Sequence, residues 1–341
     1  MYEEAFASGF RRRGIEVIPF RIEPQCESLA LKVQRRCLTG PVLGKLNRKF
    51  EATVRTERPN AIFLRNPTCI FSSTLGRIRR ERPETVLVSY CNDNPFEDGR
   101  AWLCWRHYLR NVYHCHINYF FRSSDVNHAK AMGIPNPKLL LSYFVQDLHR
   151  PQRWVQPEFR NQVVFSGHYE PDGRHLFLEH LERNGIHVKV FGPRWNELHR
   201  RSIVRQQPIR AVWGPEYVQS ISGAEIALVF LSGRNRDTYT QRCFEIPACR
   251  TLMVAPRTPE LRMLFEEDRE ALYFSTPDQL LSKVRNALAD PDWRNRIAEA
   301  GYRRCTRDQH SNIKRAAEVL SDIQSHLAER NTRAQELVTS A

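Results

Sequence analysis

The stretch from Ala224 to Ala255 constrains the possible fold of this chain more than any other part of the sequence. An apolar run at Ala224–Phe230 leads into a polar, glycine-containing loop, and a short apolar helix near Glu245 then leads into a second apolar run at Thr251–Ala255. Apolar runs of this length on both sides of a helix predict buried, parallel strands of an α/β sheet. In such sheets, ligands bind at the loops that leave the carboxyl ends of the strands.

Two acidic residues lie eight positions apart in this stretch. Asp237 lies in the polar loop, and Glu245 lies at the start of the short helix. Carboxylates at the carboxyl edge of a sheet can accept hydrogen bonds from neighbouring hydroxyl groups, so the pair indicates a sugar or ribose site. The plainer alternatives are an aspartate in an Asx-turn and a helix acid that only interacts with the helix dipole.

The length of 341 residues favours two domains rather than one core. Hydrophobic residues make up 41% and charged residues 26% of the chain, as is ordinary for a globular protein. The proline-containing stretch Gln146–Asn161 has few aliphatic residues and is expected to be a linker. We therefore expect an amino-terminal domain at 1–157, a carboxyl-terminal domain at 158–305, and a final helix in 306–341 that crosses back to the first domain.

Helices and strands are expected to alternate along both halves. In the first half, helices are expected near 2–13, 27–36, 42–57, 72–82, 100–113 and 124–132, and strands at 15–20, 61–65, 85–90, 117–121 and 139–144. In the second half, strands are expected at 163–165, 187–191, 224–230 and 251–255, and helices near 173–184, 215–222, 276–289, 291–304 and 309–329. The tail after Asn331 is expected to be frayed.

The formal net charge of +14 is concentrated in the first half of the chain. Residues 1–157 hold 25 Lys and Arg against 14 Asp and Glu. A basic surface attracts anions over long distances, and acidic glycans, lipid head groups and nucleic acid are all candidates. Simple solvated arginine-rich helix faces are an equal alternative. Nucleic acid is the least favoured partner, because the arginine clusters lack interleaved aromatic residues and a known reading motif.

Cysteine usage and hydropathy favour a cytoplasmic protein. The nine cysteines show no CxxC spacing, which argues against a disulfide framework and a zinc ribbon. The His114–His116 triplet lacks a second cluster with ligand spacing, so no metal site is expected. No apolar run approaches the roughly 20 residues of a membrane span, and the first residues do not resemble a signal peptide. Contact with a membrane surface through the basic first half stays open.

Five further segments resemble one enzyme family by their order and spacing. They are Ser89–Phe96 (SYCNDNPF), Val163–Arg174 (VVFSGHYEPDGR), Phe191–Trp195 (FGPRW), Glu216–Val229 (EYVQSISGAEIALV) and Glu299–Tyr302 (EAGY). Together with the spacing of Asp237 and Glu245, they resemble retaining GT-B glycosyltransferases, and more narrowly the CgeB-like, spore-maturation group. The resemblance covers approximately residues 85–305.

The resemblance implies an α/β protein of the GT-B class, with two Rossmann-like domains facing a central crevice. It also implies transfer of a sugar from a nucleotide sugar to a hydroxyl acceptor, with retention of configuration and without a metal or other cofactor. The donor would carry UDP, GDP or dTDP, and the pathway would be polysaccharide biosynthesis. The acceptor is expected to be an anionic or lipid-linked glycan, because the first half of the chain is basic. Members of this family begin on a strand, whereas this chain begins on a helix, so we expect a first domain without its first strand. That departure leaves open a non-catalytic glycan- or nucleotide-binding protein.

The resemblance also implies roles for individual residues. Glu245 would bind the ribose hydroxyls of the donor, and Asp237 would contact the transferred sugar, where the family has the longer glutamate. Arg242 and Arg174 would neutralise the diphosphate that departs during the reaction. Thr240 would add a hydroxyl donor beside them.

Four more residues complete the predicted site. Gly167 would let the phosphates approach the backbone, and His168 beside it is a candidate phosphate contact. Tyr217 would stack near the base or ribose, although a tyrosine that only packs its helix is the more common outcome. Asp93, in an Asn-Asp-Asn-Pro sequence, would orient or deprotonate the acceptor hydroxyl, or would simply form a turn.

Overall fold

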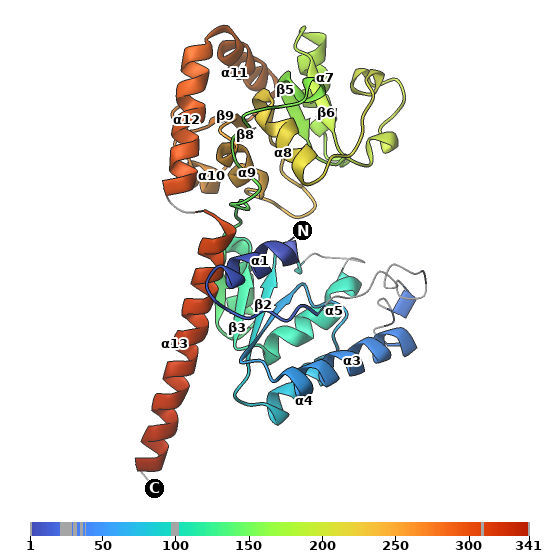
Figure 1. Ribbon diagram of the computed structural model, residues 1–341. Coiled ribbons are helices and arrows are strands. Elements are labelled where there is room, and N and C mark those ends of the chain that lie inside the picture. Colours follow the sequence, from blue (N-terminus) through green and yellow to red (C-terminus); the bar gives the residue numbers. More distant parts are fainter. Residues whose placement is uncertain are drawn as a thin grey trace. The chain divides into compact units, whose positions relative to one another are not determined.

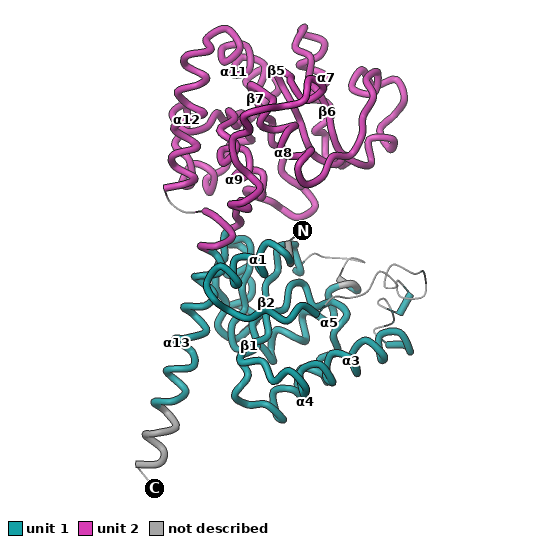
Figure 2. The backbone as a smooth tube through the Cα atoms, in the orientation of Figure 1, with its two compact units in different colours: residues 1–141, 315–341 teal, residues 142–314 magenta. Residues whose placement is uncertain are grey.

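The chain folds into two compact units. The computed structural model describes residues 2–20, 39–96, 102–307 and 310–339, together with Leu29, Val33, Gln34 and Cys37. Unit 1 consists of residues 1–141 and 315–341, and unit 2 consists of residues 142–314 (Figure 2). The predicted linker at 146–161 is therefore part of unit 2. The expected helix at 27–36 lies almost wholly outside the described residues.

Unit 1 is built on a four-stranded parallel sheet with the strand order β1-β2-β3-β4. Figure 1 labels its central strands, β2 and β3. Its strands are β1 (Ala61–Arg65), β2 (Val86–Cys91), β3 (Ile117–Phe120) and β4 (Pro137–Leu139). Its helices are α1 (Tyr2–Arg11), α3 (Pro41–Glu57), α4 (Ser72–Glu81), α5 (Trp102–Asn111), α6 (Ser123–Ala131) and most of α13 (Asn312–Thr339). All six residues of β2 and all four of β3 are buried, as expected for parallel strands covered on both faces.

The predicted strand at 15–20 is wrong. This segment has no strand structure, and Ile15 and Ile18 are 41% and 42% exposed. The described residues 2–20 and 39–60 contain no strand before β1. The aromatic rings of α1 cover the face of β1 instead, with Phe6 and Phe10 at 4.8 and 5.7 Å from the ring of Phe63.

Unit 2 holds a five-stranded parallel sheet with the strand order β6-β5-β7-β8-β9. Its strands are β5 (Asn161–Ser166), β6 (Val188–Phe191), β7 (Ala224–Leu228), β8 (Leu252–Pro256) and β9 (Leu272–Phe274). The chain first adds β6 on one side of β5 and then crosses to add β7 on the other side. The strand order thus reverses between β5 and β7, which is the position where doubly wound sheets bind ligands.

The helices of unit 2 pack on this sheet in pairs. They are α7 (Arg174–Arg183), α8 (Pro215–Ser222), α9 (Arg242–Ala248), α10 (Pro259–Leu264), α11 (Pro277–Ala289) and α12 (Pro291–Arg307). Helix α7 packs against α11, and α9 packs against α12. Two helix starts have the expected chemistry: the hydroxyls of Thr258 and Thr276 accept hydrogen bonds from amides three residues later, and a proline follows each threonine.

Three further predictions differ from the structure. The strand predicted at 139–144 ends at Leu139, and Phe144 pairs instead with Ser311. Helix α13 continues to Thr339 instead of fraying after Asn331. The sequence patterns also missed β9 and α10, because each has fewer than seven residues and shows no clear period.

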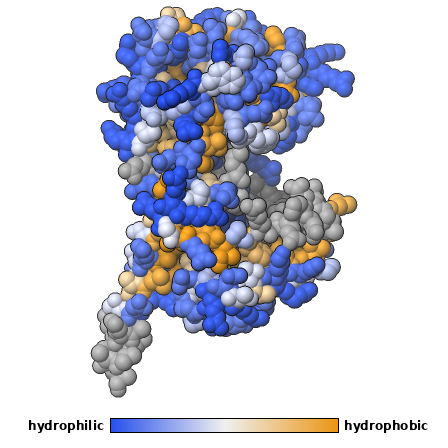
Figure 3. All heavy atoms as spheres, in the orientation of Figure 1, coloured by the Kyte–Doolittle hydropathy of each residue, from blue (hydrophilic) through white to orange (hydrophobic). Residues whose placement is uncertain are grey.

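The surfaces of the two units are largely hydrophilic in the view of Figure 3, with hydrophobic residues reaching the surface of unit 1. Among the described residues of unit 1, the exposed large hydrophobic side chains include Ile15, Ile18, Met132 and Leu139. No helix in the described part of the chain combines the length and the apolar character needed to cross a membrane.

Candidate functional site

The reversal of strand order between β5 and β7 brings the predicted donor-site residues of unit 2 to one edge of its sheet. The loop after β5 carries Gly167 and His168, and the loop after β7 leads through Asp237 to α9. The Arg242 guanidinium donates from Nε to the carbonyl of Ser166, at 2.6 Å. The first residue of α9 is therefore fixed to the carboxyl end of β5.

Ser166 also connects α8 to the same point. Its hydroxyl lies 2.8 Å from the hydroxyl of Ser220, which donates to the carbonyl of Tyr217 at 2.7 Å. Helices α8 and α9 are thus both joined to the end of β5. This arrangement brings Tyr217 on α8 next to Glu245 on α9.

Glu245 is the fourth residue of α9 rather than its first, and it is 6% exposed. The Tyr217 hydroxyl donates a hydrogen bond to its Oε2 at 2.6 Å. Burial and the neighbouring negative charge of Glu245 raise the pKa of Tyr217, so the phenol stays protonated and remains a donor. Tyr217 was expected to stack on a base or ribose, whereas the structure shows it as a direct partner of the acid.

The Glu245 carboxylate keeps unused acceptor capacity. Among the described residues, the Tyr217 hydroxyl is the hydrogen-bond donor to this carboxylate, through Oε2. The other oxygen, Oε1, faces the Nε2 atom of His149 at 3.6 Å, which is beyond hydrogen-bond distance. A carboxylate offers about four lone-pair sites, so room remains for hydroxyl donors. No sequence signal identified His149, because it lies in the stretch interpreted as a linker.

Asp237 lies near the start of α9. Its amide closes a turn on the carbonyl of Ser232, at 3.0 Å. The pKa of the Cys243 thiol is raised to about 12, mainly by burial, with the charges of Asp237 and Glu245 raising it and the charge of Arg242 lowering it. Both acids and the arginine therefore lie within electrostatic range of one thiol. The hydroxyl of Thr240 accepts a hydrogen bond from the amide of Arg242, at 3.3 Å.

A compact charge cluster occupies the loop after β5. The buried guanidinium of Arg174 contacts Asp172 at 2.6 Å, Glu170 at 3.3 Å and the carbonyl of His168 at 2.9 Å. Glu170 also contacts His168 Nε2 at 2.7 Å and accepts a hydrogen bond from the hydroxyl of Ser232 at 2.8 Å. Glu170 therefore connects the loop after β5 to the loop after β7, and the sequence analysis did not identify it.

Gly167 lies where three chain segments meet. Its carbonyl accepts a hydrogen bond from the indole of Trp195 at 2.9 Å, and its amide donates to the carbonyl of Phe191 at 2.8 Å. Gly192, with φ +141°, passes so close that a Cβ atom there would lie 2.0 Å from the Gly167 oxygen. The loops after β5 and β6 are thus in direct backbone contact.

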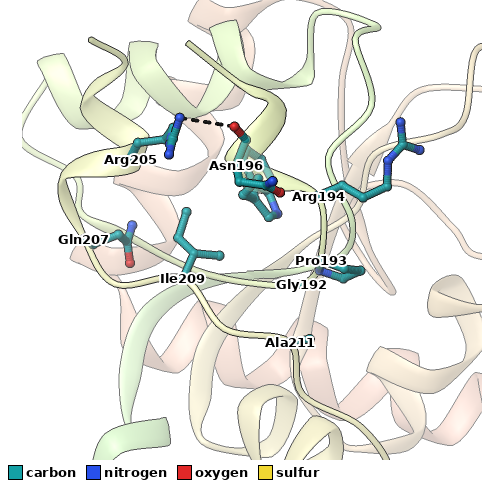
Figure 4. Close-up of a pocket in the computed structure, with 9 residues that line it drawn as sticks. Gly192, Pro193, Arg194, Asn196, Arg205, Gln207, Ile209 and Ala211 are labelled. Carbon is teal, nitrogen blue, oxygen red and sulfur yellow. Dashed lines mark hydrogen bonds between the residues drawn. The ribbon is translucent and has the colours of Figure 1, made fainter. Parts of the chain in front are cut away.

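A hollow of about 320 Å³ opens beside this contact (Figure 4). Its lining comes from the end of β6 and the segment that follows: Gly192, Pro193, Arg194, Trp195, Asn196, Arg205, Gln207, Ile209 and Ala211. Arg205 is hydrogen-bonded to the carbonyl of Asn196, whereas the Arg194 side chain extends away from it. The side-chain amide of Gln207 donates to the carbonyl of Val188 and accepts from the amide of Val190. It therefore provides hydrogen-bond partners for the backbone of β6, which is an edge strand.

Asp93 is the one predicted site residue that belongs to unit 1. It follows β2 and accepts a hydrogen bond from the side-chain amide of Asn66, at 2.8 Å. Asn66 follows β1 and has a left-handed backbone, with φ +42°. The carboxyl ends of β1 and β2 thus carry a polar pair, as expected for a ligand-binding edge.

Comparisons with known proteins agree with the fold. Residues 174–321 match a family model described as glycosyl transferase-like. Sucrose-phosphate synthase from Thermosynechococcus elongatus is similar with a TM-score of 0.69 at 11% identity, over 96% of this chain and 93% of that one. HepE from Anabaena, solved in complex with UDP-glucose, gives a TM-score of 0.63 at 12% identity, over 94% and 89%.

A glycosyltransferase from Rickettsia africae gives a TM-score of 0.58 at 10% identity, over 94% of this chain and 87% of that chain. No curated protein matches the sequence. The shared architecture confirms the predicted α/β fold of the GT-B class. The family match and this fold indicate a glycosyltransferase, and they leave its donor and acceptor open.

Proposed function

We propose that this protein transfers a sugar from a nucleotide sugar, bound by unit 2, to a hydroxyl group of an acceptor. The observation that carries this proposal is the buried Glu245 carboxylate, which lies at the strand-order reversal and retains capacity to accept hydrogen bonds. Two adjacent ribose hydroxyls match this capacity. HepE, a protein of the same fold, was solved with UDP and with UDP-glucose, which supports a nucleotide sugar as the donor.

The diphosphate of the donor is assigned to Arg242, Thr240 and the backbone near Gly167 and His168. Arg242 is already fixed to the end of β5, so its charge is in place before a ligand arrives. Arg174 contributes from a buried position, where Glu170 and Asp172 hold its guanidinium. Asp237 is assigned to the hydroxyls of the transferred sugar.

The hollow beside β6 is assigned to the base of the nucleotide. Its volume of about 320 Å³ is at the lower end of the range typical of small-ligand pockets. Two of its lining residues, Gly192 and Trp195, contact Gly167, and Arg242 contacts the preceding residue, Ser166. The hollow and the acid are thus both connected to the end of β5, which supports assigning the base to the hollow and the ribose to the acid.

The acceptor is assigned to unit 1, where Asp93 would orient the attacking hydroxyl. The excess of basic residues in 1–157 favours an anionic acceptor, such as an acidic or lipid-linked glycan at a membrane surface. We further propose membership of the CgeB-like group and a role in polysaccharide synthesis from the sequence resemblance, and a cytoplasmic location from the cysteine usage.

The reaction is proposed to retain the anomeric configuration and to need no metal. The departing diphosphate would remove the proton of the acceptor hydroxyl on the same face of the sugar, and fixed arginines would neutralise its charge. Activity should therefore persist in EDTA, and NMR should show the donor's anomeric configuration in the product. Abolition by EDTA, or an inverted product, would contradict this part of the proposal.

The first test is calorimetric titration of the protein with UDP, GDP and dTDP. We expect one nucleotide to bind, and we expect Glu245→Ala to weaken it at least tenfold. Glu266→Ala is a matched control, because this acid is exposed and its carboxylate contacts the exposed Arg269. Absence of binding at millimolar nucleotide, or equal affinity in Glu245→Ala, would overturn the donor-site assignment.

A further inference from the structure

His149 lies on the segment with which the chain enters unit 2. This segment is paired with the segment through which the chain leaves the unit, because Phe144 and Ser311 form a parallel bridge. The amide of Asn312 donates to the carbonyl of Phe144 at 2.9 Å. The backbone shortly before His149 is therefore held by the segment through which the chain leaves the unit.

The two nitrogen atoms of His149 have different environments. Nδ1 accepts a hydrogen bond from the amide of Val145 at 2.9 Å, so in the neutral ring the proton must lie on Nε2. The residue is 2% exposed, and Nε2 is a buried polar atom without a hydrogen-bond partner. A buried donor without a partner carries a free-energy cost of about 1–3 kcal/mol, and such an atom calls for an explanation.

That donor faces the carboxylate of Glu245. Nε2 lies 3.6 Å from Oε1, while the Tyr217 hydroxyl holds Oε2 at 2.6 Å. The rings of His149 and Tyr217 are edge-to-face, with centroids 6.0 Å apart. Burial lowers the pKa of His149, although the charge of Glu245 opposes this, so the ring is neutral near pH 7 and remains a single-proton donor.

We propose that His149 is a positioning residue for Glu245, and that its Nε2–H and the Tyr217 hydroxyl together fix the orientation of the carboxylate toward the ribose. This inference rests on the proposed function, because it concerns the same donor site. A movement of well under 1 Å would bring Nε2 and Oε1 to the usual N–H···O distance of about 2.9 Å. Ligand hydroxyls would then find both carboxylate oxygens already oriented.

A purely structural role would use the other nitrogen. In that case His149 would serve only to accept from Val145 and so to stabilise the turn at 145–149. Two isosteric substitutions separate the roles. His149→Asn retains an acceptor close to the position of Nδ1 and removes the donor toward Glu245. His149→Gln places an amide donor close to the position of Nε2 and removes the acceptor for Val145.

The experiment measures the affinity of each variant for the nucleoside diphosphate that the wild type binds (UDP, GDP or dTDP, written below as UDP) and for its 2′,3′-dideoxy analogue. We expect His149→Asn to bind UDP about tenfold more weakly, as for one lost hydrogen bond to a charged group. We expect His149→Gln to stay within about threefold of the wild type, even where its melting temperature is lower.

The dideoxy analogue supplies a measurement that a structural role would not affect. The wild type should prefer UDP over the analogue, and this preference should fall markedly in His149→Asn, because Glu245 no longer points at the ribose. Loss of binding in His149→Gln with retention in His149→Asn would assign His149 to the turn alone and overturn the proposal. Unchanged UDP affinity in both variants would overturn it as well.

The proposed function can fail separately from this inference. If the wild type binds a nucleotide and Glu245→Ala loses it while His149→Asn does not, the donor site stands and the role of His149 is refuted. If the wild type binds no nucleotide, both are refuted.

Discussion

The hydroxyl of Tyr217 is the donor that reaches the Glu245 carboxylate directly, at 2.6 Å. Replacing Tyr217 by Phe removes this donor and keeps the ring that packs beside His149. We expect nucleotide affinity to fall about tenfold, since a hydrogen bond to a charged group contributes roughly 1.5–3 kcal/mol. Calorimetric titration checks this, with Tyr302→Phe as a control on α12. An unchanged affinity in Tyr217→Phe would show that the carboxylate does not depend on this hydroxyl.

Glu170 gives the loops after β5 and β7 a dependence on pH. Its partial burial opposes ionisation, but the hydrogen bonds from His168 and Ser232 and the charge of Arg174 dominate and lower its pKa from 4.5 to about 2. Because the folded pKa is depressed, the stabilisation is present above pH 4.5 and is lost as the pH falls toward 2. The difference in melting temperature between wild type and Glu170→Gln should therefore be larger at pH 6 than at pH 3.5. A constant difference would contradict the pairing.

Single residues of the site could be predicted only where they belong to a local pattern. Glu245, Arg242 and Asp237 lie within one strand–loop–helix segment, and their spacing was visible in the sequence. The contact of His149 with Glu245 joins residues 96 positions apart, and only the packed backbone of unit 2 determines it. Tyr217 is predicted to stack on the base or ribose, and the structure adds a hydrogen bond from its hydroxyl to Glu245, which the sequence could not indicate.

At the scale of elements, the contact between the loops after β5 and β6 is the most sensitive point of unit 2. Gly192→Ala would place a Cβ atom 2.0 Å from the Gly167 oxygen, and we expect a loss of about 3 kcal/mol of unfolding free energy. Gly185→Ala is the matched control: Gly185 also has a positive φ, +78°, but no atom lies within 4 Å of its added Cβ. There we expect a cost of about 1 kcal/mol. Urea denaturation measures both, and equal losses would show that the contact is not required.

Helices and strands could be predicted from the sequence where their apolar residues are buried in the core of a unit. The strand at 61–65 was placed correctly, and β2 and β3 differed by one residue at their ends. The segment at 15–20 has a similar apolar content but forms no strand, although β1 is an edge strand of its sheet. Apolar content alone therefore does not decide whether a segment joins the sheet. Helix α10 has a local start signal in the sequence, Thr258–Pro259, although its six residues are too few to show a period.

At the scale of the whole molecule, the chain enters unit 2 once and returns to unit 1 only with α13. Unit 1 therefore needs a helix that is more than 170 residues away from its own fourth strand. Ala316, Val319 and Ile323 are buried within unit 1. The sequence indicated such a returning helix by resemblance to the GT-B class, whereas the contacts that fix it could be identified only from the structure.

Asp322 holds this helix in unit 1 by two contacts, and it provides a test of how far the units are independent. Its carboxylate accepts the Tyr119 hydroxyl at 2.5 Å and contacts the Lys138 ammonium at 2.7 Å, which connects α13 to β3 and β4. In Asp322→Ala, amide hydrogen exchange in β3 and β4 should accelerate about tenfold, as expected for a loss near 1.4 kcal/mol. Gln324→Ala, an exposed position on the same helix, should leave exchange unchanged.

Exchange in β5 and β7 of the Asp322→Ala variant should remain at the wild-type rate, because these strands belong to unit 2. Acceleration in both sheets would instead show that the two units unfold together.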